Sequence, residues 1–217
     1  MIVDLNLHGK IVIVIGGGNE AQKRINSLLK QGCEILVISD SINSQINKLV
    51  KTKKIKLKKE KIQNTKFISK FKPNIIITTT NDKKINQKII NDAKRNNIIV
   101  YSSDNPEDSD FSNPAIIDFE NMIQIAIFTG GRSPAMSKKI RIQSEKIFKK
   151  IITKEDIAQI KIQKIARKLA KESISTQTHR REYLRSIMAD NEIEQLIKDG
   201  QLKKAEKRAI TMLRNWK

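Results

Sequence analysis

The stretch from Lys10 to Asp40, KIVIVIGGGNEAQKRINSLLKQGCEILVISD, constrains the fold more than any other part of this sequence of 217 residues. An apolar run, Ile11 to Ile15, is followed at once by three glycines, a helical pattern and a second apolar run that ends in Asp40. Continuous Ile and Val are typical of a strand that is covered on both faces of a parallel sheet. The order therefore predicts a strand, a tight turn, a helix and a second parallel strand.

The glycines match the G-x-G-x-x-A pattern of dinucleotide-binding folds at Gly16, Gly18 and Ala21. Asp40 lies 22 residues beyond Gly18, near the spacing of about 20 expected for the acidic residue that binds the ribose. A carboxylate there accepts a hydrogen bond from a ribose hydroxyl and repels a 2′-phosphate. The pattern predicts an NAD site, with preference for NAD over NADP.

The start of the predicted helix, at Asn19 and Glu20, supplies the second part of this site. Its backbone N–H groups and the helix dipole favour the negative charge of a pyrophosphate. The alternative interpretation is a tight strand-to-helix turn that binds no ligand.

The first half of the chain repeats the alternation of strand and helix. Strand patterns follow at Glu34 to Ser39, around Ile55 and Leu57, at Asn74 to Thr80 and at Ile98 to Ser102, with helical stripes between most of them. Residues 60–73 are weakly patterned. This alternation predicts an α/β fold with a Rossmann-like, parallel, doubly wound sheet, in an NAD-binding domain over residues 1–113.

Two further groups of candidates lie at strand ends, where a doubly wound sheet forms its ligand crevice. Thr79, Thr80 and Asn81 end the strand that begins at Asn74 and can line a nicotinamide ribose pocket, although such residues also cap helices. Asp104 lies one strand further along and can remove a proton or hold a metal. A surface turn is the alternative for this carboxylate.

The pattern changes after Asp104. A turn-rich acidic segment leads to two apolar runs, Ala115 to Phe119 and Met122 to Phe128, which predict a hairpin. The loop that follows combines free backbone N–H groups, hydroxyls and a cation in front of a helix start, where Ser133 is the expected N-cap. We interpret it as an anion site for a substrate carboxylate; a plain strand-to-helix connection is the alternative. Its residues are Thr129, Gly130, Gly131, Arg132 and Ser133.

Only helical patterns follow from Ala135 to the end, which predicts a helical C-terminal region. The expected apolar stripes are those of a core or a dimer face. They comprise Ile140, Ile147, Phe148 and Ile151; then Ile157, Ile160, Ile165 and Leu169; then Ile187, Ile193, Leu196 and Ile197; then Ala205, Ala209 and Leu213.

Composition limits the partners. The formal net charge of +20 favours polyanions, but the absence of a concentrated basic helix or a recognisable nucleic-acid motif argues against DNA or RNA. No apolar run approaches the roughly 18 residues that cross a bilayer, and no signal peptide is evident, so we expect a cytoplasmic protein without membrane contact. A single cysteine and two histidines exclude an internal disulfide and a thiolate or histidine-rich metal site.

Several motifs occur together, in order, with the opening stretch. They are TTTNDKKINQKI at 78–89, VYSSD at 100–104, FSNPAII at 111–117, TGGRSPAMSKKIR at 129–141 and THRREYLRS at 178–186. This set resembles the precorrin-2 dehydrogenase/sirohydrochlorin ferrochelatase family, the amino-terminal module of siroheme synthase. The resemblance covers almost the whole chain.

The resemblance implies an NAD-dependent oxidation of precorrin-2 to sirohydrochlorin, in some members followed by insertion of Fe2+ to give siroheme. It implies NAD contacts at Asn19, Glu20, Asp40 and Ser41. The family's catalytic aspartate, implicated in both dehydrogenation and chelation, falls on Asp104, which is therefore also the candidate metal ligand. The eight carboxylates of precorrin-2 suit a broadly basic enzyme, because long-range attraction raises affinity and association rate.

The resemblance also implies a homodimer. The family's middle segment, here 114–150, interlocks between subunits, and a helical domain follows over 151–217. The chain departs from the family at Glu20, a position that is often apolar, and at Arg132, which is often Thr.

Two other functions stay open at this point. A redox-sensing NAD-binding regulator could use the same nucleotide-binding unit without turning over a tetrapyrrole. A degenerate protein in which NAD binding is only structural is the third interpretation.

Overall fold

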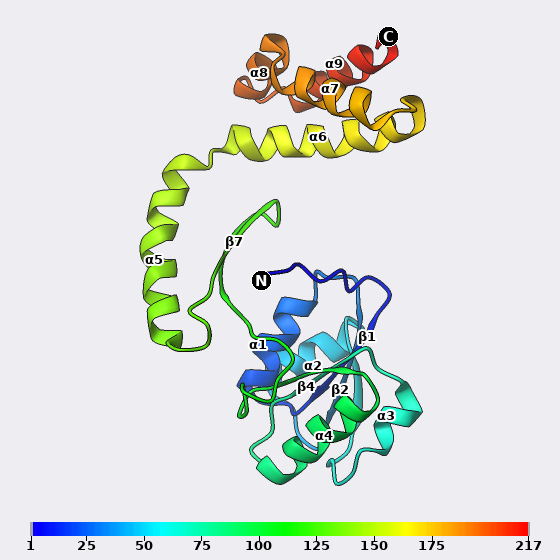
Figure 1. The fold of residues 1–217 in the computed structure, drawn as a ribbon, viewed down its shortest axis with the longest axis vertical. Coiled ribbons are helices and arrows are strands. Elements are labelled where there is room, and N and C mark those ends of the chain that lie inside the picture. The colour runs from blue at the N-terminus through cyan, green and yellow to red at the C-terminus, as the bar shows by residue number, and fades with distance from the viewer. Residues whose placement is uncertain (1, 217) are drawn as a thin grey trace. The chain divides into compact units, whose positions relative to one another are not determined.

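A five-stranded parallel sheet with the order β3-β2-β1-β4-β5 organises the first half of the computed structural model, which describes residues 2–216 (Figure 1). Its strands are β1 (Ile11–Ile15), β2 (Glu34–Ser39), β3 (Lys56–Lys59), β4 (Ile75–Thr78) and β5 (Ile99–Ser102). The chain runs outward from β1 to β3, then crosses back to β4 on the other side of β1. The predicted doubly wound α/β fold is confirmed, and its switch point lies between β1 and β4.

Helices cover both faces of this sheet. Side chains of α1 (Asn19–Leu28) and α2 (Ser44–Lys51) pack with Val12 and Val14 on one face. Those of α3 (Lys66–Phe71) and α4 (Lys83–Arg95) pack with Ile13 and Ile15 on the other. Alternate residues of β1 thus point to opposite layers, which explains its uninterrupted apolar run.

Two helices differ from the prediction. The helix expected from Ala21 to Gln31 begins at Asn19 and ends at Leu28. Helix α3 lies in the segment to which the sequence assigned no element. It is only six residues long and ends where Lys72 adopts a left-handed conformation, with φ of 46°. A stripe of this length is too short to give a helical period.

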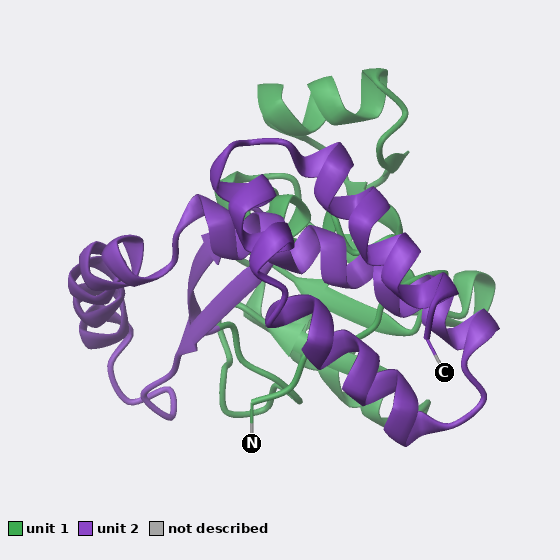
Figure 2. Ribbon diagram, turned by 90° about the horizontal axis from the view of Figure 1, so that it is seen from above, with its two compact units in different colours: residues 1–113 green, residues 114–217 purple. Residues whose placement is uncertain are grey.

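Residues 114–217 form a second compact unit (Figure 2). It begins with the predicted hairpin of β6 (Ala115–Phe119) and β7 (Ile123–Ile127), whose turn residues Glu120 and Asn121 both have positive φ. Helix α5 (Pro134–Ile151) follows, and the side chain of Ser133 caps it as predicted by accepting from the amide of Met136.

The remaining four helices pack around a largely aliphatic core that also contains Tyr183, so the predicted helical C-terminal part is confirmed. They are α6 (Lys154–Ser173), α7 (Gln177–Met188), α8 (Asn191–Lys198) and α9 (Leu202–Arg214). The stripe predicted for α6 is wrong in part, since Ile165 is 36% exposed. The buried face instead carries Ala158, Ile162, Ala166 and Ala170. Alanine lets neighbouring helices approach closely, a role that a search for large apolar residues overlooks.

Among residues 2–216, no helix combines the length and apolar character required to cross a membrane.

Candidate functional site

The carboxyl ends of four strands lie in one row at the edge of the sheet. Ile15 of β1 pairs with Ile38 of β2 and with Thr78 of β4, and Thr78 pairs with Ser102 of β5. The loops after these strands therefore emerge side by side. These loops and the first turn of α1 contain all the candidate residues that the sequence places in the first unit.

The glycine turn after β1 fits closely against its neighbours. A Cβ on Gly16 would lie 2.5 Å from Thr79 Oγ1, and one on Gly17 would lie 2.0 Å from the carbonyl oxygen of Ser41. A Cβ on Gly18 would meet nothing within 4 Å. Gly16 and Gly17 thus allow the loops to pack, whereas Gly18 leaves its backbone open to a ligand. The motif did not single out Gly17, because its close neighbour lies in a loop distant in sequence.

Helix α1 begins at Asn19 without a side-chain cap. Its first backbone N–H groups therefore have no intrahelical acceptor and no side chain that replaces one. The Oδ1 atom of Asn19 is 3.4 Å from Asn43 Nδ2. This uncapped helix start has the features of an anion-binding site.

The carboxylate of Glu20, in the first turn of α1, is neutralised by neighbouring cations. It pairs with Lys23 at 3.2 Å and with Arg24 at 2.5 Å. Burial alone would raise the pKa of Glu20, but the cations of Arg24 and Lys23 lower it below its ordinary value. Because the negative charge is balanced locally, Glu20 leaves the site acceptable to an anion through the backbone.

Asp40 and Ser41 follow β2 and are exposed. Ser41 Oγ donates to Asp40 Oδ1 at 3.3 Å. A cavity of about 180 Å³ opens beside them, and it reaches from Asp40 to the loops after β3 and β4. Its lining includes Gly16, Lys61, Thr80 and Asn81. The structure therefore places Asp40, Thr80 and Asn81 around one hollow next to the glycine turn.

The side-chain hydroxyls of Thr79 and Thr80 donate hydrogen bonds to other groups of the protein. Thr79 Oγ1 donates to the carbonyl of Ile15 at 2.8 Å, and Thr80 Oγ1 donates to Asn86 Oδ1 at 2.7 Å. Asn81 stays exposed. The side chain that caps α4 is that of Asp82, which accepts from the amides of Lys84 and Ile85.

Asp104 is held by a buried polar network. Its Oδ1 atom accepts from Ser102 Oγ at 2.6 Å and from Asn86 Nδ2 at 3.0 Å. Ser102 also contacts Thr78 through their hydroxyls at 2.7 Å, and Thr78, Asn86 and Ser102 are all buried. No hydrogen bond within residues 2–216 engages the Oδ2 atom, so one oxygen of this exposed carboxylate stays available for chemistry.

Asn86 is a candidate positioning residue that the sequence did not predict. It is 1% exposed and lies in the first turn of α4, on the apolar face beside Ile85 and Ile89. A polar side chain on an apolar stripe is a signal that could have found it, since a buried amide requires partners. Its partners are the side chain of Asp104 and both oxygens of Thr80.

The acidic segment after Asp104 folds back onto β5. Asp110 Oδ2 accepts from the amide of Val100 at 2.8 Å, and Ser109 Oγ accepts from the amide of Ser102 at 2.9 Å. The amide of Asp110 donates to the carbonyl of Val100. The loop that carries Asp104 is therefore fixed at both ends to the same strand.

In the second unit, the turn from Thr129 to Ser133 uses its hydroxyls internally. Thr129 Oγ1 contacts Ser137 Oγ at 2.9 Å and Ser133 O at 3.1 Å, and Ser133 caps α5. Gly130 and Gly131 have φ of 65° and 74°, and both are exposed. The exposed Arg132 has no ion pair within residues 2–216. The groups available to an anion in this turn are therefore the glycine backbone and Arg132, while Thr129 and Ser133 shape it.

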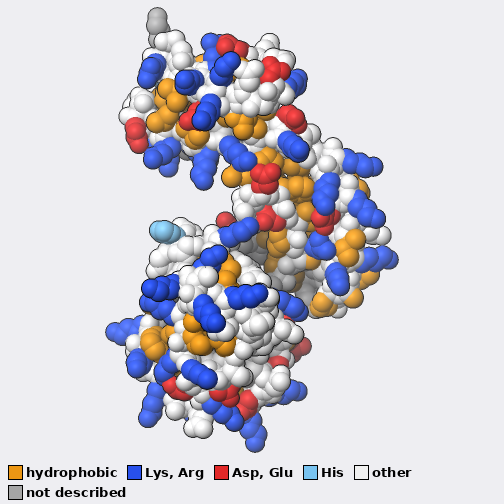
Figure 3. Space-filling view, turned by 180° about the vertical axis from the view of Figure 1, so that it is seen from behind, with side chains coloured by type: hydrophobic (Ala, Val, Ile, Leu, Met, Phe, Trp, Pro, Cys, Tyr) orange, Lys and Arg blue, Asp and Glu red, His pale blue; other side chains and the backbone are white. Residues whose placement is uncertain are grey.

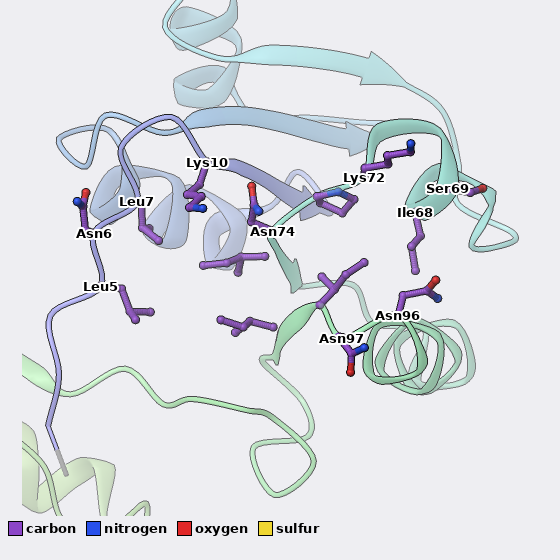
Figure 4. Close-up of a pocket in the computed structure, with 14 residues that line it drawn as sticks. Leu5, Asn6, Leu7, Lys10, Ile68, Ser69, Lys72, Asn74, Asn96 and Asn97 are labelled. Carbon is purple, nitrogen blue, oxygen red and sulfur yellow. The ribbon is translucent and has the colours of Figure 1, made fainter.

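A larger cavity of the first unit lies at the opposite, amino edge of the sheet. It measures about 710 Å³, and Figure 4 shows Leu5 and Leu7 of the N-terminal segment along one side, with Lys10, Asn74 and Asn97 around it. The chemistry-bearing residues described above do not line it. Size alone therefore does not identify the active site.

The excess of Lys and Arg over Asp and Glu is spread over the surface and is not gathered in one patch. Figure 3 shows Lys and Arg side chains distributed over the visible face of both units.

No group of three or more His, Cys, Asp or Glu residues that could hold a metal ion occurs in the described part of the chain. The open backbone at Gly18, the uncapped start of α1 and Asp40 fit a dinucleotide.

The first unit of the chain matches a known protein family, and curated relatives are similar to it. Residues 3–115 match the model of a family described as putative NAD(P)-binding. A precorrin-2 dehydrogenase from Priestia megaterium is 29% identical over 139 residues, which cover 64% of this chain and 66% of that protein. A siroheme synthase from Psychrobacter arcticus is 33% identical over 139 residues, 64% of this chain but only 25% of that protein.

The fold is also that of a solved structure. SirC, precorrin-2 dehydrogenase, superposes with a TM-score of 0.70 at 22% identity, covering 96% of this chain and 99% of that one. At this identity the likeness establishes the fold of the chain.

Proposed function

The chain belongs to the putative NAD(P)-binding family, and from this premise we propose that it is an NAD-dependent dehydrogenase that oxidises precorrin-2 to sirohydrochlorin in siroheme biosynthesis. The observation that carries the proposal is the row of strand ends at one sheet edge. An open glycine turn, Asp40 and a tethered Asp104 all emerge there. Relatives named precorrin-2 dehydrogenase and siroheme synthase support the substrate.

The protein residues bind and orient the cofactor. Gly16, Gly18, Asn19 and Glu20 would hold the pyrophosphate through backbone N–H groups. Asp40 and Ser41 would bind the adenosine ribose, and Asp40 would select NAD against NADP by repelling a 2′-phosphate. When bound, NAD supplies the hydride acceptor.

Asp104 would accept the proton that leaves the substrate together with the hydride. Conversion of precorrin-2 to sirohydrochlorin removes two hydrogens, one as a hydride and one as a proton. The free Oδ2 atom of Asp104 would accept the proton, while Ser102 and Asn86 hold the carboxylate through Oδ1. Thr79, Thr80 and Asn81 would line the nicotinamide ribose pocket, with the orientation of Thr80 set by Asn86.

The substrate is a polycarboxylate, and the turn at residues 129–133 would bind one of its carboxylates. Arg132 would donate from its guanidinium, and Gly130 and Gly131 from their amides. The net charge of +20 would increase the association rate, more strongly at low salt.

Insertion of Fe2+ into sirohydrochlorin is the proposed second activity. Fe2+ would be a substrate of this step. Asp104 would be its transient ligand through the available oxygen. An anaerobic incubation of sirohydrochlorin with Fe2+ tests this step, and an absorption spectrum that does not change would contradict it.

The proposal includes a homodimer in the cytoplasm. Residues 114–150 would pair the two subunits, since Met136, Ile140, Ile147 and Ile151 of α5 are exposed apolar side chains. The redox-sensing regulator is not favoured, because the relatives are named as biosynthetic enzymes.

The decisive experiment is an anaerobic incubation of precorrin-2 with the protein, with and without NAD. We expect NADH absorbance and the sirohydrochlorin spectrum only when NAD is present. Asp104→Asn should abolish or strongly reduce the rate, whereas Glu107→Gln, which removes the same charge from the same loop, should retain it. Full activity of Asp104→Asn would remove this residue from the mechanism.

A further inference from the structure

A hollow of about 200 Å³ lies between α6 and α7 in the helical part of the second unit. Four cationic side chains line it together with two apolar ones and the amide of Gln177. Arg167, Lys171, Arg180 and Arg181 supply the charge, and Ala170 and Leu184 are the apolar side chains. No acidic residue lines this hollow, which is called the α6–α7 arginine site below.

The four cations of the α6–α7 arginine site have no counterion in the described part of the chain. None of them takes part in an ion pair within residues 2–216, whereas other arginines of the same unit do. Arg208 pairs with Asp190 and Glu192, and Arg141 pairs with Glu145. Four like charges around one small volume repel each other, and a bound anion relieves this repulsion.

The cations of this site are mostly arginines, and this favours a carboxylate as the ligand. The chain contains 33 lysines and only 10 arginines, yet three of the four cations here are arginines. A guanidinium donates two parallel hydrogen bonds to a carboxylate, which an ammonium group does not. Arg180 is oriented in advance, because its Nε atom donates to the carbonyl of Thr176 at 3.2 Å.

The apolar residues specify the rest of the ligand. Ala170 is 1% exposed, and Leu184 is half-buried. A carboxylate on a short methylene stem satisfies both parts of the α6–α7 arginine site. A bare inorganic anion would leave the apolar wall without a partner.

We propose that the α6–α7 arginine site binds carboxylate side chains of the tetrapyrrole. This inference rests on the proposed function for the identity of the ligand. It assigns substrate recognition to residues outside the dinucleotide-binding unit and outside the turn at 129–133.

Binding of uroporphyrin, a stable octacarboxylate porphyrin, tests the site without catalysis. Trp216, the only tryptophan, packs edge-on against Tyr183 in the same unit, so quenching of its fluorescence reports the bound porphyrin. The variant is Arg167→Gln/Arg181→Gln, which breaks no hydrogen bond of the described structure. The matched control is Lys203→Gln/Lys207→Gln on α9, which removes the same two charges from exposed positions that do not line the hollow. Thermal melting verifies that both variants are folded.

We expect the arginine variant to bind uroporphyrin at least about tenfold more weakly, because charge-assisted hydrogen bonds are lost. The lysine control should change the dissociation constant less than about twofold. Equal losses in the two variants would show a response to net charge alone and overturn the proposal, as would no binding by the unmodified protein. Displacement of the porphyrin by inorganic phosphate at constant ionic strength would assign the site to phosphate and overturn it too.

The proposed dehydrogenase function is read out separately, by NADH formation from precorrin-2. Porphyrin binding that depends on Arg167 and Arg181 without any NADH formation would refute the dehydrogenase and leave a polycarboxylate site. NADH formation with unchanged porphyrin binding in the arginine variant would refute only the α6–α7 arginine site.

Discussion

The side-chain amide of Asn86 donates a 3.0 Å hydrogen bond to the Oδ1 atom of Asp104, and so connects the first turn of α4 to the loop after β5. The same side chain accepts from Thr80 Oγ1 and donates to the carbonyl of Thr80. Asn86 therefore fixes two loops of the strand-end row at once, although it is itself buried.

Replacing Asn86 by Ala should lower kcat about 10- to 100-fold, because Asp104 would lose its orientation at the reacting position. The KM for NAD should rise by a smaller factor, because Thr80 also loses its partner while the glycine turn and Asp40 are intact. Loss of three hydrogen bonds should also lower stability by about 1 to 3 kcal/mol. Steady-state kinetics and thermal melts measure both effects. Lys88→Ala, on an exposed position of α4, is the control, and a normal kcat in Asn86→Ala would show that Asp104 is oriented without it.

Gly17 and Gly18 should respond in opposite ways to alanine. A Cβ at Gly17 would collide with the backbone of Ser41, so Gly17→Ala should destabilise the fold by about 1 to 3 kcal/mol or more. A Cβ at Gly18 meets open space, so Gly18→Ala should melt like the unmodified protein but show a smaller shift when NAD is added. Thermal melts with and without NAD measure both. A normal NAD-linked shift in Gly18→Ala would contradict the expected approach of the cofactor at this residue.

Asp40→Asn should weaken the preference for NAD. The variant removes the negative charge that repels a 2′-phosphate while keeping a hydrogen-bonding group. We expect the ratio of kcat/KM for NAD over NADP to fall at least about tenfold, the effect of one charged contact. Asp82→Asn is unsuitable as a control because Asp82 caps α4; Asp4→Asn serves instead. A ratio equal to that of the unmodified protein would mean that another group selects the cofactor.

Alkaline stability should depend on Tyr183. This side chain is 0% exposed, and its hydroxyl donates to the carbonyl of Ala209 at 2.9 Å. Burial raises the pKa of Tyr183 from 10.0 to about 12. The neutral phenol is thus favoured in the folded protein, and its contribution is complete below pH 10 and is lost as the pH rises from 10 to about 12.

The size of this loss is about 2 to 3 kcal/mol. Denaturant unfolding between pH 9 and pH 12 would measure it, in the unmodified protein and in Tyr183→Phe. We expect the difference in unfolding free energy between the two proteins to shrink across this window. A difference that stays constant with pH would show that the phenol titrates equally in both states.

The oligomeric state should depend on α5. Ile147 and Ile151 are 59% and 61% exposed, a high value for large apolar side chains on a helix. Ile147→Lys should shift the mass in light scattering from twice 24.8 kDa toward the single chain. Gln143→Lys adds the same charge to an exposed position of α5 and should not. A monomeric unmodified protein would refute the homodimer.

The sequence predicted the strands of the first unit well because their period and flanking turns are local. The bounds of β1 and β2 follow from apolar runs that end at a glycine and at an aspartate. The start of α5 follows from Ser133 and Pro134, whose capping chemistry is also local.

The missed features depend on contacts between distant parts of the chain. Gly17 is required by the backbone of Ser41, and Asn86 by Asp104, and neither partner is evident from a spacing rule. The buried face of α6 was misplaced because small residues such as Ala166 pack there, and size-weighted periodicity favours Ile165 instead. Tertiary packing therefore decided the points at which local pattern failed.

The fold-back of the acidic segment onto β5 affects more than the position of Asp104. β5 is an edge strand, and an edge strand exposes backbone groups that can pair with a strand from another molecule. Here the amides of Val100 and Ser102 already donate to Asp110 and Ser109. The loop that orients the candidate catalytic carboxylate thus also blocks this side of the sheet against aggregation through strand addition, and a mutation that loosens it would affect solubility as well as turnover.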